Sequence, residues 1–430
     1  MHKKFLIALL NQKTLSNKSH GILAGILCAL SLSAFIYLEY FLNEKNFPFY
    51  STVFAVFGFF LYFKLSRLGS FICGGILGIL WFYWVGLSFR FYELSYLIPL
   101  VWVIFFVIYG ALFYAFCFFA NPLYRLATLT LSSHIHPFGF NWLILEAVLT
   151  KSYFFPSKFT LFLLLCAIVI LSILLTKKLY KISFIWFCIF CLLLPHNKEI
   201  KTNPNTTPLK IKTTRFDIPQ DERWQTSQIH KILAQNFDAI IEAKNANYDL
   251  IVLPETAFPL SLNLQPELLR RLKKESQEIA ILTGGIYQDS TQENSRFFNS
   301  AYLFQNGEMQ VFHKLILVPF GEKIPLPAFI TKWINKIFFD NAEDFTTQDF
   351  KMPNFAWIKN QKFQIAICYE ATRNEFYTDS PSNLIAISNN AWFTPSIEPT
   401  LQKLLMLYFS KNHETKIYHS SNASENFALP

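Results

Sequence analysis

The segment Phe363-Gln-Ile-Ala-Ile-Cys-Tyr-Glu370 is an apolar run that ends in a thiol followed by two polar residues. The run predicts a short buried strand with Cys368 at its carboxyl end. In open α/β sheets, reactive groups gather at the carboxyl ends of the strands. Because Cys368 is the only cysteine after Cys191, it has no disulfide partner in its own half of the chain. It is therefore a candidate nucleophile, and the alternative interpretation is an inert buried thiol.

The first half of the chain has the composition of a polytopic membrane protein. Residues up to Pro195 contain 14 Lys and Arg against 4 Asp and Glu, whereas the remainder of the 430 residues is balanced at 24 against 25. The net charge of +9 thus belongs to the first half, where small basic groups alternate with long apolar runs. This distribution follows membrane topology and argues against a nucleic-acid-binding patch.

Seven segments are candidates for crossing a membrane, because a spanning helix needs about 20 largely apolar residues. They are residues 21–43, 48–63, 68–89, 95–120, 126–149, 158–176 and 179–195. With a cytoplasmic N-terminus, seven crossings place most Lys and Arg residues inside, in accord with the positive-inside rule. Residues 196 onward then lie on the far side of the membrane. Omitting the polar fifth segment would instead place them in the cytoplasm.

Alternating strands and helices fill the second half, which predicts an α/β domain over residues 209–430 after a polar linker at 196–208. Apolar or alternating runs predict strands at 209–216, 248–253, 278–287, 298–304, 309–314, 363–368, 383–388 and 416–421. Apolar residues at three- and four-residue spacing predict helices around 229–241 and 398–411.

An apolar, aromatic segment between Pro325 and Phe339 interrupts this pattern. Its Trp and Phe residues suit a membrane interface, so one interpretation is an arm that dips into the bilayer surface. The other interpretation is an ordinary amphipathic helix packed on the domain.

Three groups with complementary chemistry stand out, namely Glu255, Lys314 and Cys368. A thiol with an ordinary pKa of about 8.5 is mostly protonated at neutral pH, so it needs a base or a positive neighbour. The hypothesis assigns Glu255 as the base that takes the thiol proton. It assigns Lys314 as the cation that stabilises the thiolate and the oxyanion of a tetrahedral intermediate.

The residues around these groups resemble the Glu, Lys and Cys motifs of the nitrilase superfamily, in that order. The strings are Leu-Pro-Glu255-Thr-Ala-Phe-Pro, His313-Lys314-Leu-Ile-Leu-Val-Pro-Phe-Gly-Glu322 and Ile-Cys368-Tyr-Glu370. The long lysine motif, Ile-Ser-Asn-Asn-Ala-Trp-Phe at 387–393, Asp217-Ile-Pro-Gln-x-x-x-Trp224 and the multi-helix membrane half are together similar to the apolipoprotein N-acyltransferase family.

This resemblance implies an α-β-β-α sandwich on a polytopic α-helical bundle, on the periplasmic side of a bacterial inner membrane. It also implies that an acyl chain passes from a membrane phospholipid, through a thioester on Cys368, to the N-terminal amine of a diacylglyceryl-cysteine apolipoprotein. Neither a metal nor a cofactor is expected. By matching position, the residues that would support the site are Trp224, Asn299, Glu322, Tyr369, Glu370 and Trp392.

The C-terminal end departs from the family pattern. The family continues into an eighth membrane helix, whereas no apolar run follows residue 408 here, so we expect a short C-terminus without that helix. A short family branch and a truncated reading frame both remain open. Two other functions also remain open: a membrane-tethered amidase of the same superfamily, and an inactive relative that only binds lipoproteins.

Overall fold

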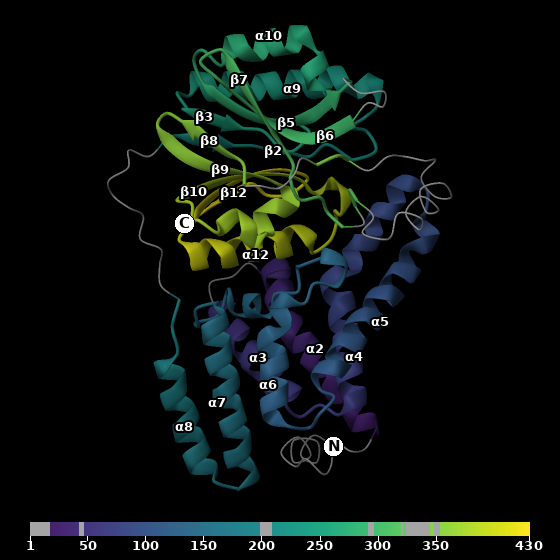
Figure 1. The fold of residues 1–430 in the computed structure, drawn as a ribbon, viewed down its shortest axis with the longest axis vertical. Helices are drawn as coiled ribbons and strands as arrows, with labels where there is room; N and C mark the ends of the chain where they lie inside the picture. The colour runs from purple at the N-terminus through teal and green to yellow at the C-terminus, as the bar shows by residue number, and fades with distance from the viewer. Residues whose placement is uncertain are drawn as a thin grey trace.

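Two parts build the molecule: a bundle of helices and an α/β domain that stacks on one end of it (Figure 1). The computed structural model describes residues 18–42, 47–197, 209–290, 296–319, 321–323, 345–347 and 353–430. The aromatic segment 325–339 and most of the predicted linker 196–208 lie outside these described residues.

The bundle is made of apolar helices whose connections lie alternately near the α/β domain and far from it. Its helices are α2 (Lys18–Phe41), α3 (Phe47–Tyr62), α4 (Arg67–Phe82), α5 (Ile98–Phe116), α6 (Pro122–Leu131), α7 (Lys158–Thr176) and α8 (Tyr180–Leu193). Within the described residues, four helices are long and apolar enough to cross a membrane: Ser19–Phe41, Arg67–Tyr92, Ser95–Phe116 and Lys158–Thr176. Helices α3 and α8 are apolar but shorter.

The fifth predicted span, residues 126–149, does not form one continuous helix. Helix α6 stops at Leu131, and short 3₁₀ turns follow, ending with η5 (Leu145–Leu149). Consecutive serines and then Pro137 interrupt the helix, and Phe138 and Gly139 both have positive φ angles. The segment nevertheless runs from one end of the bundle to the other. Arg125 donates to main-chain carbonyls at the far end of α3, whereas the Trp142 ring nitrogen donates to Thr372 of the α/β domain.

The glycines of α4 let it pack closely against its neighbours. A Cβ atom on Gly74 would lie 2.2 Å from the main-chain oxygen of Tyr109 on α5, and one on Gly69 would lie 2.6 Å from the oxygen of Gly21 on α2. Small residues allow this close approach of backbones, which is the usual means of association between helices in a membrane.

Two mixed sheets form the α/β domain, and each combines parallel with antiparallel strand pairs. The first has the order β1-β3-β5-β6-β7, with β4 paired to β5. Its strands are β1 (Ile211–Thr213), β3 (Leu250–Val252), β4 (Phe258–Ser261), β5 (Ala280–Asp289), β6 (Arg296–Gln305) and β7 (Glu308–His313). The second has the order β12-β11-β10-β9-β8, with β2 paired to β11. Its strands are β2 (Arg215–Phe216), β8 (Phe355–Ile358), β9 (Gln361–Ile367), β10 (Asn383–Asn389), β11 (Lys416–Asn422) and β12 (Phe427–Leu429).

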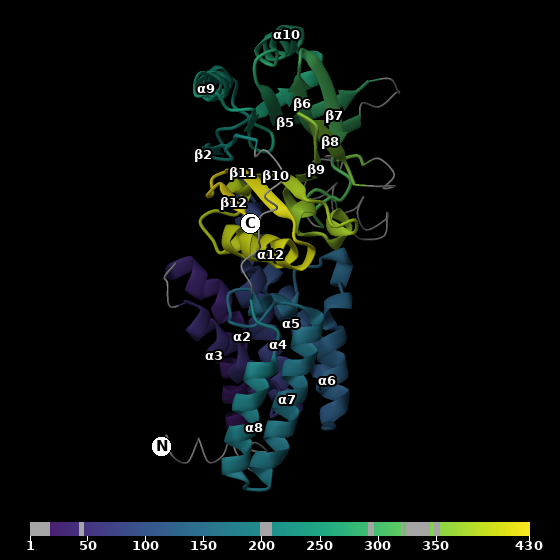
Figure 2. The same cartoon turned by 90° about the vertical axis from the view of Figure 1, so that its left-hand side faces the viewer.

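The layers confirm the expected α-β-β-α sandwich (Figure 2). Side chains from both sheets form a buried core between them, and Ile365 and Ile367 of β9 point into it. Helices α9 (Thr226–Asn245) and α10 (Pro266–Glu275) cover the outer face of the first sheet. Helix α12 (Glu398–His413) covers the outer face of the second, where Ala366 of β9 contacts it because successive side chains point to opposite faces.

The predicted strand at 209–216 divides between the two sheets. Its first part is β1, which pairs with β3, and its last part is β2, which pairs with β11. Thr214 lies between them: its hydroxyl donates to the main-chain oxygen of Val252, and its own carbonyl accepts a hydrogen bond from Ser420. The chain therefore passes from the first sheet to the second at Thr214.

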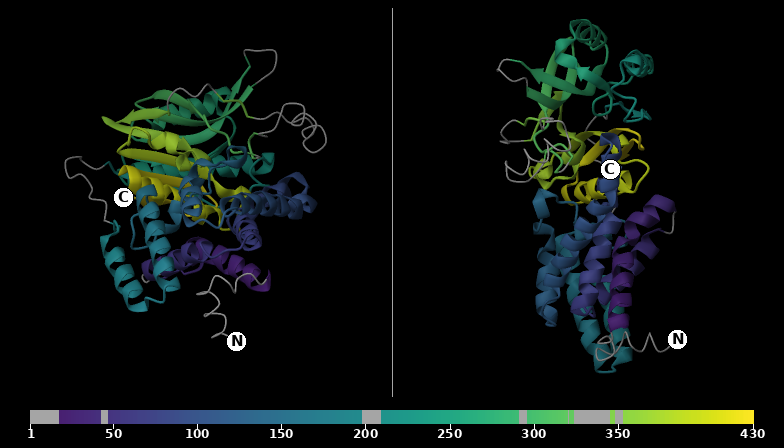
Figure 3. Two further views of the ribbon diagram at one scale, coloured as in Figure 1. Left: turned by 60° about the horizontal axis from the view of Figure 1, so that its bottom comes forward. Right: turned by 90° about the vertical axis from the view of Figure 1, so that its right-hand side faces the viewer.

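Helix α12 lies between the second sheet and the bundle (Figures 1 and 3). Apolar residues on α12, including Leu404 and Leu405, belong to one continuous buried cluster that also contains bundle residues. Near this contact, the buried carboxylate of Glu39 on α2 pairs with Lys403 at 3.5 Å and with Lys151 at 3.2 Å. The α/β domain is thus seated on the bundle through both apolar and ionic contacts.

The close approach at Gly74 yields a stability prediction. Replacing Gly74 by Ala puts a methyl group against the Tyr109 carbonyl, and overpacking of this kind costs about 1–3 kcal/mol. We expect the melting temperature of the purified protein in detergent to fall. The matched control is Gly86→Ala, whose Cβ would meet its nearest neighbour, a side-chain atom of Ile98, at 3.3 Å. Equal melting temperatures for the two variants would contradict the packing argument.

Candidate active site

Cys368 lies at the carboxyl end of β9, where the strand turns into the 3₁₀ helix η7 (Cys368–Thr372). Strand β9 is flanked by β8 and β10, so the nucleophile stands on an interior strand of its sheet. The cysteine is partly exposed and has a φ angle of 56°. A non-glycine residue held in this left-handed region costs on the order of 1–3 kcal/mol, so the surrounding contacts must fix the turn.

Glu370 supplies the contacts that fix this turn. One of its oxygens accepts hydrogen bonds from the main-chain N–H groups of Leu315 at 2.6 Å and Ile316 at 3.0 Å. The other accepts from the N–H of Ile367 at 2.8 Å. Glu370 is fully buried, and it ties the residue before Cys368 to the residues after Lys314. Its part in the site is therefore to hold the nucleophile turn and the lysine loop together.

Glu255 follows β3 and is held by donors from three other segments. Its Oε1 accepts from the side-chain amide of Asn299 at 2.7 Å and lies 3.5 Å from Nζ of Lys314. Its Oε2 accepts from the main-chain N–H of Asn389 at 2.7 Å. Asn389 ends β10, the strand beside β9, so this bond brings the carboxylate to the strand end next to Cys368. The backbone of Glu255 fits there because Gly284 of β5 has no Cβ; such an atom would lie 2.7 Å from the Glu255 Cα.

Lys314 is a buried cation between two carboxylates. Its side chain is 1% exposed, and Nζ lies 2.7 Å from Glu322 and 3.5 Å from Glu255. Burial alone lowers the pKa of Lys314, but the charges of Glu322 and Glu255 outweigh it and raise the pKa above its ordinary value. The lysine is therefore positively charged at any pH at which the protein is folded. The main-chain N–H of Lys314 donates to the carbonyl of Asn299, so the same loop aligns both side chains.

The thiol of Cys368 has a pKa well above its ordinary value. Burial is the largest cause, the negative charge of Glu255 adds to it, and Lys314 opposes it. The resting thiol is thus protonated at neutral pH and needs a base at the moment of attack. The side-chain amide of Gln402 on α12 donates to its sulfur over 3.9 Å.

The sequence analysis did not single out four residues around this site: Arg223, Asn389, Glu398 and Gln402. The buried Arg223 donates to the main-chain oxygen of Glu255 at 3.2 Å and to the hydroxyl of Thr256 at 2.6 Å. Burial lowers its pKa to about 10, so it keeps its charge. Arg223 and Asn389 lie inside the sequence motifs at 217–224 and 387–393. Membership of these motifs is the sequence feature by which the two residues could have been found. Burial, with a contribution from the charge of Glu255, raises the pKa of Glu398.

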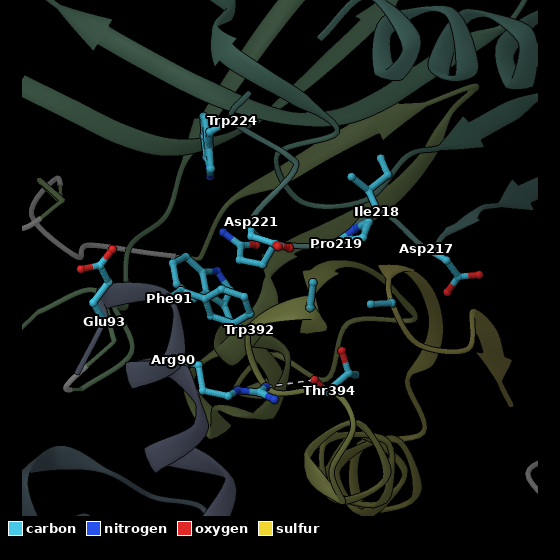
Figure 4. Close-up of a pocket in the computed structure, with 13 residues that line it drawn as sticks. Arg90, Phe91, Glu93, Asp217, Ile218, Pro219, Asp221, Trp224, Trp392 and Thr394 are labelled. Carbon is cyan, nitrogen blue, oxygen red and sulfur yellow. Dashed lines mark hydrogen bonds between the residues drawn. The ribbon is translucent and has the colours of Figure 1, made fainter. Parts of the chain in front are cut away.

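The other predicted residues lie at two different places. Trp224 and Trp392 do not join the catalytic cluster but line a cavity beside it (Figure 4). The hydroxyl of Tyr369 points toward the bundle, where it donates to the side chain of Asn141 at 2.8 Å and accepts from its main-chain N–H at 3.1 Å. Tyr369 thus links the nucleophile turn to the bundle through its side chain. No cluster of metal-binding side chains occurs within the part of the chain that the structure describes.

The sandwich, the order of its strands and the Glu–Lys–Cys cluster define a carbon–nitrogen hydrolase domain, here mounted on a bundle of apolar helices. The carbon-nitrogen hydrolase family matches residues 217–411, and the integral membrane domain of apolipoprotein N-acyltransferase matches residues 19–193. The chain belongs to the apolipoprotein N-acyltransferase family and is an acyltransferase.

Two relatives illustrate how far this similarity extends. An apolipoprotein N-acyltransferase of Wolinella succinogenes is 39% identical over 408 residues, which cover 95% of each chain. An apolipoprotein N-acyltransferase of Helicobacter pylori is 37% identical over 374 residues, which cover 85% of this chain and 84% of the relative.

The three hydrogen bonds of Glu370 lead to a graded prediction. Glu370→Gln keeps an acceptor for Leu315 and Ile316 but turns an N–H group toward Ile367, which leaves that buried donor unpaired at a cost of about 1–3 kcal/mol. Glu370→Ala leaves all three donors unpaired and is expected to destabilise the protein more. Thermal unfolding measures this order, with the exposed Glu308→Gln as control. Equal stability of the alanine variant and the control would contradict the assigned role.

Proposed function

We propose that the protein transfers an acyl chain from a membrane phospholipid to the N-terminal amine of a diacylglyceryl-cysteine apolipoprotein, through a thioester on Cys368. The observation that carries the proposal is the convergence of Glu255, Lys314 and Cys368 on a domain that is seated on a bundle of apolar helices. Attack on a lipid substrate is supported by this arrangement, because the catalytic domain packs directly on helices that are long and apolar enough to cross a membrane.

In the first half-reaction, Glu255 takes the proton from the Cys368 thiol as the sulfur attacks an ester carbonyl carbon of the phospholipid. A carbon–sulfur bond forms, and the carbonyl oxygen becomes an oxyanion. The positive charge of Lys314 and the main-chain N–H of Tyr369, at the start of η7, supply its stabilisation. Collapse breaks the carbon–oxygen bond, and the proton passes from Glu255 to the departing glycerol oxygen. The products are the acyl-enzyme and a lysophospholipid.

In the second half-reaction, the neutral α-amine of the acceptor attacks the thioester carbonyl. The nitrogen–carbon bond forms while Glu255 accepts a proton from the amine, and the same oxyanion contacts apply. The carbon–sulfur bond then breaks, and the proton returns from Glu255 to the Cys368 sulfur. Exclusion of water matters at this stage, because hydrolysis of the thioester would waste the acyl group.

The charge distribution of the bundle supports a location in the inner membrane of a bacterium, with the catalytic domain in the periplasm. Lys64, Arg67 and Arg125 lie at the end of the bundle away from the α/β domain, as does the connection between α7 and α8 with Lys177 and Lys178. Cytoplasmic loops carry an excess of Lys and Arg, so this end is the one expected in the cytoplasm.

An acyl-enzyme assay tests the proposed function. Incubation of the purified protein with phospholipid should add the mass of one acyl chain to the peptide that contains Cys368, and Cys368→Ser should abolish transfer to a diacylated lipopeptide. Cys188→Ser is the matched control, because this thiol is exposed on α8, away from the site. Release of ammonia from small amides without any acyl-enzyme from phospholipid would instead identify an amidase.

The raised pKa of Cys368 predicts the pH dependence of its alkylation by iodoacetamide. Since the thiolate fraction is small below the pKa, the rate should increase about tenfold for each pH unit between pH 6 and 9. Glu255→Gln removes the negative charge that raises this pKa, so alkylation at a given pH should become faster. Acylation by phospholipid should become slower, by about a hundredfold or more, because the base is lost.

Mass spectrometry of the Cys368 peptide measures both rates. A plateau in the alkylation rate already at pH 7 would contradict the raised pKa. A parallel decrease of both rates in Glu255→Gln would contradict the assignment of Glu255 as the base.

A further inference from the structure

A cavity of about 820 Å³ is lined by residues of both the bundle and the α/β domain (Figure 4). The 3₁₀ helix η1 (Tyr83–Tyr92), which continues α4, supplies Arg90 and Phe91. The loop before α9 supplies Asp221 and Trp224, and the turn after β10 supplies Trp392. A volume of this size accommodates several residues of a peptide or a ligand of similar size.

The cavity adjoins the proposed base through two hydrogen bonds. Gln220 lines the cavity, and its side-chain oxygen accepts from the side-chain amide of Asn389 at 2.9 Å. The main-chain N–H of the same Asn389 donates to Glu255. Asn389 thus links the wall of the cavity to the proposed base.

Among the described residues that line the cavity, acidic side chains outnumber basic ones, three to one. The guanidinium of Arg90, the basic one, donates to the main-chain oxygen of Thr394 at 3.0 Å, and Asp217 pairs with Arg215 at 3.1 Å. Glu93 and Asp221, in contrast, have no ion-pair partner among the residues that the structure describes. An anionic phosphate group is disfavoured in these surroundings, whereas a cationic group is favoured.

The aromatic residues of the cavity provide a second feature that can bind a cation. The ring of Trp392 already contacts two other rings: it stacks on Tyr92 with 5.8 Å between ring centroids and lies edge-on to Phe91 at 5.5 Å. Trp224 has 48% of its surface exposed and lies three residues after Asp221 in the same turn region. An exposed indole ring and a carboxylate that line the same cavity suit a lysine or arginine side chain, since cation–π and ionic attraction act together.

We propose that this cavity binds the peptide part of the acceptor and favours a basic side chain shortly after the acylated cysteine. The inference rests on the proposed function, because it assumes that the amine of the acceptor reacts at Cys368. Glu93, Asp221 and Trp224 then determine acceptor preference without taking part in bond making or breaking.

The test compares two acceptor lipopeptides that differ only in a Lys or a Glu at the second position after the lipidated cysteine. The enzyme is first acylated with phospholipid, and the kcat/KM for loss of the acyl group to each peptide is then measured. We expect the Lys peptide to be preferred several-fold at low salt, in keeping with exposed charges, and less at high salt. In the double variant Glu93→Gln/Asp221→Asn the ratio should fall to about one, while the rate of Cys368 acylation stays unchanged.

The matched control is Asp238→Asn, which removes the same type of charge from an exposed position on α9 outside the cavity. It should leave the Lys-to-Glu ratio unchanged. Equal use of both peptides by the wild-type enzyme would overturn the inference while leaving the proposed function intact. Slower acylation of Cys368 in the double variant would also overturn it, because the cavity would then bind the donor.

Binding measurements separate this inference from the proposed function. The fluorescence of Trp224 and Trp392 should report tighter binding of the Lys peptide than of the Glu peptide to the Cys368→Ala variant. This preference is expected even if Cys368 is never acylated. Equal affinity for the two peptides would overturn the inference regardless of the enzymatic result.

Discussion

The buried positive charge of Lys314 is the constraint on which the rest of the site depends. A cation that is 1% exposed requires anionic partners, and Glu322 and Glu255 provide them. These partners must come from different parts of the chain, so the lysine loop, β6 and the turn after β3 are drawn to one point. The same charge opposes the burial and the carboxylates that keep Cys368 protonated. One ionic contact thus organises the fold of the site and tunes its chemistry.

A second constraint comes from α12, which lies between the second sheet and the bundle within one continuous buried cluster. On one side it covers Ala366 and Ala386 of the second sheet, and on the other it contacts α2 and η5 of the bundle. Gln402 and Glu398, on the same helix, face the catalytic cluster. The catalytic domain detached from the bundle would expose the apolar side of α12 to water. The soluble half is therefore expected to need the membrane half for its solubility as well as for its location.

The sequence predicted secondary structure well where its residues alternate or form a continuous apolar run. Alternation and apolar runs predicted β5, β9 and β10, and Glu255 and Cys368 follow the ends of β3 and β9. Sequence patterns could not show that residues 209–216 change sheets at Thr214, because both halves alternate alike. The span predicted over 126–149 is not one continuous helix, because two serines and Pro137 interrupt it after Leu131. Arg223 and Gln402 were missed because their importance arises only from long-range contacts.

The contact between Tyr369 and Asn141 joins the residue after the nucleophile to the membrane bundle. A change in helix tilt that displaces Asn141 would therefore act on the turn that holds Cys368. Helices tilt when the hydrocarbon thickness of the bilayer differs from their own apolar length. The thickness of the surrounding bilayer would then bear on the nucleophile, in addition to the role of lipid as a reactant. Reconstitution in lipids of graded acyl-chain length would vary this quantity while the protein chemistry stays constant.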